Sequence, residues 1–133
     1  MTHWSPQPLS GPRYWVRKFR HAFRGVRQGV RDQSSFAVHL FAALAVVVAG
    51  LVLRVERLEW CLLLLCVTAV LVAELFNTSL ELICQAITRD FDERLRDALD
   101  IASAAVLLVA LGAVAVGVLV FGVRLAALFG AGG

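Results

Sequence analysis

Three long apolar stretches constrain this chain more than any other feature of its sequence. They occupy residues 36–53, 60–87 and 101–123, and a helix needs about 20 apolar residues to cross a bilayer. Hydrophobic residues make up 59% of the 133-residue chain, which is well above the average of soluble domains. We therefore predict an all-α membrane protein in which residues 33–124 form one domain with three transmembrane helices.

A basic segment, residues 13–32, precedes the first apolar stretch and is predicted to form an amphipathic surface helix. Its apolar residues recur at helical spacing and arginines occupy much of the remainder, a pattern typical of helices that lie in the lipid headgroup layer. A nucleic-acid partner is the alternative for a basic run, but we expect none beside membrane spans. No signal peptide is expected. The remaining ends, residues 1–12 and 125–133, are expected to be a disordered and a flexible tail.

The basic residues also predict an orientation in the membrane. Ten of the 13 lysines and arginines lie in the N-terminal segment or in the loop expected at residues 88–100. Because positive charge marks cytoplasmic segments, we expect both on the cytoplasmic side of a bacterial inner membrane. Trp60 is then expected to be an interfacial anchor on the outer side.

A polar stripe interrupts the second apolar stretch, where Glu74, Asn77 and Glu81 follow one another at i, i+3 and i+7. At 1.5 Å per residue, Glu74 lies about 21 Å from Trp60 and Glu81 about 31 Å. The first position is inside a hydrocarbon core of about 30 Å, and the second is at its cytoplasmic edge. A charged side chain in the core costs about 2.5–3.5 kcal/mol, so the stripe indicates a polar groove lined by protein.

Two carboxylates at different depths are suited to phosphoryl transfer. The poorly solvated Glu74 could act as a general base, while Glu81 could hold a divalent cation that carries phosphate oxygens. The alternative is a hydrogen-bond cluster that only packs helices. The third span begins with Asp100, and the small residues around Ser103 either allow close helix packing or leave room for a ligand.

These residues resemble a known family. ELFNTSLE, residues 74–81, is similar to the E-x-x-N-[ST]-[AS]-x-E signature of the prokaryotic diacylglycerol kinase and undecaprenol kinase family, and residues 100–106 resemble its D-x-x-S-A-A-V signature. The resemblance covers roughly residues 16–122. It implies a homotrimer with active sites between subunits. Such a kinase transfers the γ-phosphate of ATP, with Mg²⁺, to the hydroxyl of a membrane lipid.

The resemblance also implies roles for individual residues. Glu74 would be the catalytic base and would contact the lipid, whose head group Ser103 would face. Glu81 would hold the metal on the nucleotide, with Gln33 as a weaker ligand where the family has a second glutamate. The residues expected to bind nucleotide are Asn77, Glu81, Asp92 and Asp100.

Two interpretations of the function remain open, because Gln33, Gln85 and Leu99 stand where the family has two acidic residues and a lysine. The preferred one is a lipid kinase, in which Arg94 or Arg96 could supply the missing charge. The alternative is a catalytically degenerate relative that binds lipid, nucleotide or another membrane protein. A channel subunit is less favoured, because no span is polar along its length. His39 is accordingly interpreted as a packing residue rather than a pore or lipid contact.

Overall fold

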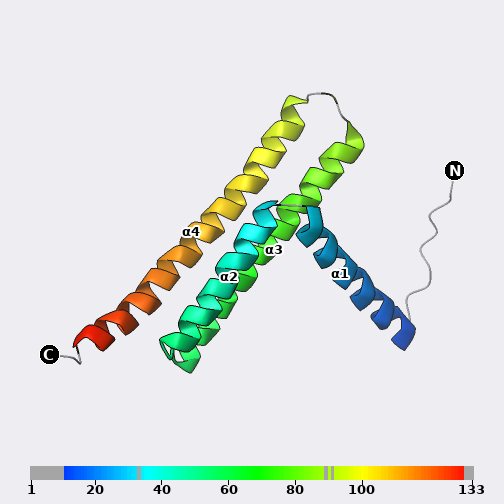
Figure 1. Ribbon diagram of the computed structural model, residues 1–133. Helices are drawn as coiled ribbons and strands as arrows, with labels where there is room; N and C mark the ends of the chain where they lie inside the picture. The colour runs from blue at the N-terminus through cyan, green and yellow to red at the C-terminus, as the bar shows by residue number, and fades with distance from the viewer. Residues whose placement is uncertain (1–10, 33, 89, 91, 131–133) are drawn as a thin grey trace. The chain divides into compact units, whose positions relative to one another are not determined.

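The computed structural model describes residues 11–32, 34–88, 90 and 92–130, which form four helices and, within these ranges, no strand (Figure 1). They are α1 (Pro12–Asp32), α2 (Ser34–Val52), α3 (Arg57–Ile87) and α4 (Glu93–Gly130). The predicted all-α class is confirmed. The chain divides into two compact units, residues 1–32 and 33–133, which are described separately.

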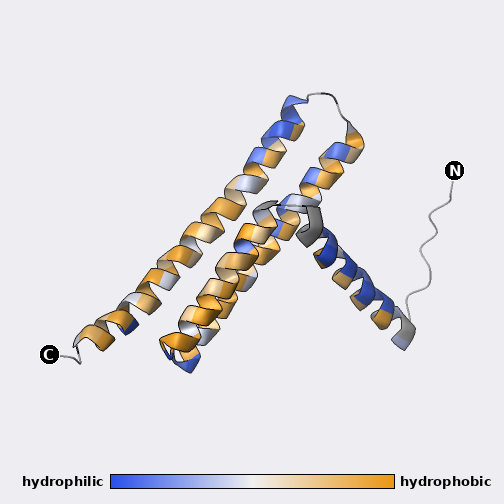
Figure 2. Ribbon diagram, viewed as in Figure 1, coloured by the Kyte–Doolittle hydropathy of each residue, from blue (hydrophilic) through white to orange (hydrophobic). Residues whose placement is uncertain are grey.

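The first unit contains α1, whose sides differ in polarity as predicted (Figure 2). The side chains of Trp15, Phe19 and Phe23 are all exposed. The ammonium group of Lys18 lies 5.3 Å from the centroid of the Trp15 ring, within the range of a cation–π interaction. The helix therefore presents a continuous apolar face beside a basic one, as interfacial helices do.

The second unit contains three helices that are each long and apolar enough to cross a membrane (Figure 2). Large apolar side chains cover their outer surfaces, and Leu44, Leu108 and Leu119 are 60–70% exposed. Exposure of this kind along three whole helices suits a lipid solvent rather than water. The chain is thus an integral membrane protein with three spans.

Helix α4 extends further at both ends than the span that the sequence indicated. Residues 93–100, expected in a loop, form its first two turns, and helix continues to Gly130, into the segment expected to be a flexible tail. The start has a clear cause: the Asp92 carboxylate accepts hydrogen bonds from the backbone N–H groups of Arg94 (2.9 Å) and Leu95 (3.1 Å). These bonds satisfy donors that would otherwise be unpaired in the first turn.

Helix α3 packs most extensively on α4, which runs antiparallel to it, and less extensively on α2 (Figure 1). A small buried cluster of Val55, Leu63 and Val120 lies near the connection between α2 and α3, and Trp60 packs against it. Trp60 also covers Gly50 of α2, where an added β-carbon would lie 2.7 Å from Cη2 of the indole. Trp60, expected to be an interfacial anchor, is therefore also a packing residue between helices.

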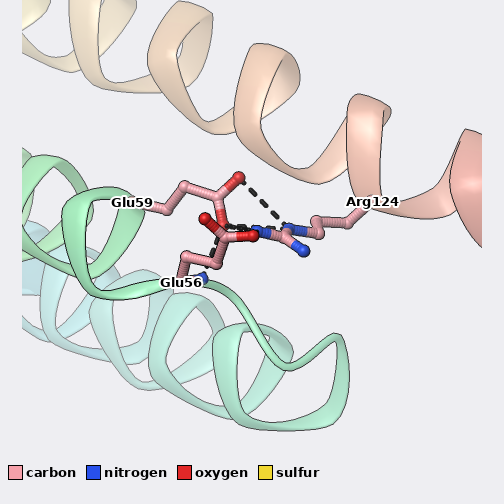
Figure 3. Close-up of polar contacts among 3 residues, drawn as sticks. All are labelled: Glu56, Glu59 and Arg124. Carbon is pink, nitrogen blue, oxygen red and sulfur yellow. Dashed lines mark hydrogen bonds and ion pairs between the residues drawn. The ribbon is translucent and has the colours of Figure 1, made fainter.

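A cluster of charged residues joins the beginning of α3 to the end of α4 (Figure 3). The Arg124 guanidinium contacts Oε2 of Glu59 through Nη2 (2.6 Å) and Nε (2.9 Å), and its Nη2 also lies 2.9 Å from Oε1 of Glu56. The Glu56 backbone N–H in turn donates to Oε2 of Glu59 at 2.7 Å. Bidentate pairing of this type has a fixed geometry, so the cluster fastens the two helices in register. Nothing in the local sequence predicts this cluster.

Candidate functional site

A groove of about 240 Å³ lies between the three spans, towards the opposite end of the helices from the Arg124 cluster. Its apolar lining comes from α4, through Val106, Leu107 and Ala110. Its polar lining comes from all three helices: Ser35, His39, Glu74, Asn77 and Ser103. A polar groove inside a membrane domain is costly to maintain, and such sites mark binding or transport.

Glu74 is the most deeply buried side chain of the groove, with 1% of its surface exposed. Its Oε2 lies 3.8 Å from Nε2 of His39 in α2. Its Oε1 is buried and has no hydrogen-bond partner among the described residues. A buried carboxylate oxygen without a partner is energetically unfavourable, so this atom is suited to receive a hydrogen bond from a ligand.

The polar stripe on α3 is held together by a hydrogen bond that Nδ2 of Asn77 donates to Oε1 of Glu81, at 2.9 Å. Glu81 is only partly buried and lies nearer the end of α3. Asn77 Oδ1 and Thr78 Oγ1 are buried and, within the described part of the chain, lack hydrogen-bond partners. Each such atom costs about 1–3 kcal/mol when left unpaired, which makes this face of α3 receptive to further polar contacts.

The structure brings together some of the expected site residues and separates others. Glu74, Asn77 and Ser103 line the groove, and Glu81 is joined to them through Asn77. Asp100 is exposed on α4, three residues before Ser103, and is not part of the lining. Asp92 caps α4, so its nucleotide-binding role stays a prediction. Gln33, the weaker metal ligand, lies outside the described residues.

A magnesium ion requires oxygen ligands in an octahedral arrangement. No group of three or more His, Cys, Asp or Glu side chains able to hold a metal occurs among the described residues. Mg²⁺ is commonly bound by one or two carboxylates together with substrate phosphates and water. The Glu81 carboxylate therefore fits a metal that arrives with a nucleotide better than a resident metal.

Two lining residues, His39 and Ser35, were not among the predicted site residues. An ionisable residue inside a span is itself a signal of function, so His39 could have been selected from the sequence, whereas Ser35 offered no such signal. The arginines proposed as replacement charges lie outside the groove lining. Arg96 is paired with Asp97 at 3.0 Å.

Comparison with known proteins identifies the family of the chain. A family model described as prokaryotic diacylglycerol kinase matches residues 20–121. A diacylglycerol kinase of Synechocystis sp. is 36% identical over 100 residues, which are 74% of this chain and 57% of that protein. An undecaprenol kinase of Bacillus subtilis is 30% identical over 107 residues, which are 80% of this chain and 87% of that protein. The chain thus spans little more than half of the Synechocystis relative. With the family model covering most of its length, the chain belongs to the prokaryotic diacylglycerol kinase family.

Proposed function

We propose that the protein is a membrane lipid kinase that transfers the γ-phosphate of ATP to the hydroxyl of a lipid alcohol such as diacylglycerol or undecaprenol. The observation that carries this proposal is the buried Glu74 carboxylate, which lines a groove with Ser103 and has an unpartnered Oε1. The names of the two relatives support the substrate class, since both are kinases of lipid alcohols.

In the proposed reaction, Glu74 accepts the proton of the lipid hydroxyl while Ser103 hydrogen-bonds the lipid head group. The lipid oxygen forms a bond to the γ-phosphorus, the bond from that phosphorus to the bridging oxygen breaks, and ADP leaves. Positioning and charge neutralisation contribute most to phosphoryl transfer. Asn77 orients Glu81 towards the nucleotide through its 2.9 Å hydrogen bond. Mg²⁺, when bound at Glu81, would neutralise charge on the phosphate oxygens.

The assembly and the orientation are part of the same proposal. The distribution of basic residues supports a cytoplasmic N-terminus and a cytoplasmic 88–100 segment. The family resemblance supports a homotrimer in the bacterial inner membrane. Chemical cross-linking in native membranes tests the assembly, and a ladder that stops at three copies is the expected result. A ladder that stops at two would contradict it.

The experiment that tests the activity uses purified protein in mixed micelles with radiolabelled Mg-ATP and either diacylglycerol or undecaprenol. We expect labelled lipid from the unchanged protein and none from Glu74→Gln, which keeps the shape of the side chain but loses the base. Glu56→Gln, at the other end of the helices, is the matched control. If folded protein labels neither lipid, the kinase proposal is wrong. The alternative then replaces it: a catalytically degenerate relative that binds lipid, nucleotide or another membrane protein.

Nucleotide-induced thermal stabilisation tests the role of Glu81 separately. A ligand that binds only the folded state raises the melting temperature, and the rise grows with the ratio of ligand concentration to its dissociation constant. We expect ATP to stabilise the protein in the presence of Mg²⁺, and Glu81→Gln to lose most of this effect. Equal stabilisation of both proteins would remove Glu81 from the proposed metal site.

A further inference from the structure

An ionised carboxylate at the position of Glu74 requires a compensating charge. Glu74 is 1% exposed, and a buried charge is tolerated only when it is paired and hydrogen-bonded. Yet a general base must be ionised before the reaction in order to accept a proton. The proposed function therefore needs a source of positive charge close to this carboxylate.

His39 is placed to supply that charge. Its Nε2 lies 3.8 Å from Oε2 of Glu74, and 22% of its side chain is exposed. Histidine is the side chain whose charge changes most readily near neutral pH. The contact joins α2 to α3, and no other ion pair of Glu74 occurs among the described residues.

The surroundings of the pair strengthen its electrostatic interaction. The other polar residues that line the groove, Ser35, Asn77 and Ser103, are uncharged. On its other side, His39 lines a second cavity of about 190 Å³, where Cys66 is the one further titratable side chain of the described lining. The next carboxylate on α3, Glu81, is bonded to Asn77. Charges attract more strongly inside a protein than in bulk water.

We propose that His39 is a positioning residue that pairs with the Glu74 carboxylate, compensates its charge and so keeps it available as the base. The catalytic consequence of this inference rests on the proposed function. The pairing of His39 with Glu74 does not depend on it. The two can therefore be tested separately.

The first test is a double-mutant cycle on thermal stability in detergent, which requires no activity. His39→Leu should lower the melting temperature, because it leaves a buried carboxylate without its partner. In the Glu74→Gln background, where that carboxylate is absent, the same change should have a much smaller effect. His21→Leu, at an exposed position of α1, is the control and should change little. Additive effects of the two substitutions would overturn the proposal.

The second test measures kcat and KM for several residues at position 39. His39→Gln should lower kcat by about tenfold or more, with KM for Mg-ATP unchanged, because nucleotide binding does not involve this pair. His39→Lys, which keeps a positive charge, should recover more of kcat than Gln does. Equal rates for Lys and Gln, or full kcat in His39→Leu, would overturn the proposal. If even the unchanged protein labels no lipid, the proposed function fails, and the stability cycle alone decides whether the pair exists.

Discussion

The indole of Trp60 in α3 lies directly against the backbone of Gly50 in α2. A β-carbon at Gly50 would be 2.7 Å from Cη2 and 2.9 Å from Cζ2 of the ring, closer than such carbon atoms approach one another. The ring is rigid and is itself held against the cluster of Val55, Leu63 and Val120. Close approach of these two helices therefore depends on the absence of a side chain at position 50.

Gly50→Ala is consequently expected to destabilise the protein by about 1–3 kcal/mol, the usual cost of overpacking. Thermal unfolding in detergent measures the effect. Gly122→Ala is the control, since nothing lies within 4 Å of a β-carbon there. Trp60→Leu should relieve much of the loss by removing the ring. Equal melting temperatures for the two alanine variants would contradict the packing described.

Arg124→Ala should lower the melting temperature because it releases the end of α4 from both Glu59 and Glu56. Arg124→Lys should lower it less, since lysine keeps the charge but lacks the planar guanidinium that contacts two carboxylates at once. The difference should shrink at high salt, because both partners reach solvent and are screened. An Arg124→Ala variant as stable as the unchanged protein at low salt would show that the cluster adds nothing.

Ser103→Leu should raise KM for the lipid by about tenfold and leave KM for Mg-ATP nearly unchanged. The larger side chain fills the groove beside Glu74 and removes a hydroxyl that could bond the lipid head group. Ser103→Thr, which keeps the hydroxyl, should be affected less. Ala115→Leu, at an exposed position on the same helix, is the control. A rise in KM for ATP alone would place Ser103 on the nucleotide side instead.

Asp92→Ala should destabilise α4 by about 1 kcal/mol, the typical loss when a helix cap is removed. Asp92→Asn should retain the cap, because its side-chain oxygen can still accept from the backbone N–H groups of Arg94 and Leu95. These variants separate a structural role from nucleotide binding. If Asp92→Asn is stable but no longer stabilised by Mg-ATP, the residue binds nucleotide as the resemblance implies.

The three spans and the site stripe could be predicted because they depend on local sequence. Hydropathy identifies a span without knowledge of its neighbours, and the spacing of Glu74 and Asn77 places both on one side of α3. The Ser103 position followed from the family resemblance, and the structure brings it to the same groove. Sequence thus anticipated much of the groove lining, and the roles of its residues stay predictions.

The remaining features depend on contacts between distant segments. Arg124 and Glu59 are 65 residues apart, and nothing local indicates that their helix ends meet. His39 was interpreted as a packing residue because one histidine in an apolar span has no evident partner until α2 lies beside α3. The start of α4 was misplaced for a different reason: a charged segment that begins a helix resembles a loop unless its cap at Asp92 is recognised.

The continuity of α4 has a geometric consequence for any lipid that reaches Glu74. The helix runs without interruption from Glu93 to Gly130, so Asp100 and Ser103 are separated along its axis by about 4.5 Å, at 1.5 Å per residue. A head group held at Ser103 is therefore less than one helical turn from the charged end of α4, and its acyl or prenyl chains need not leave the bilayer. One inserted residue between these positions would alter that depth by only about 1.5 Å but would rotate one side chain about 100° relative to the other. The spacing between Asp100 and Ser103 therefore determines the relative direction of their side chains around the helix more than it determines their relative depth in the membrane.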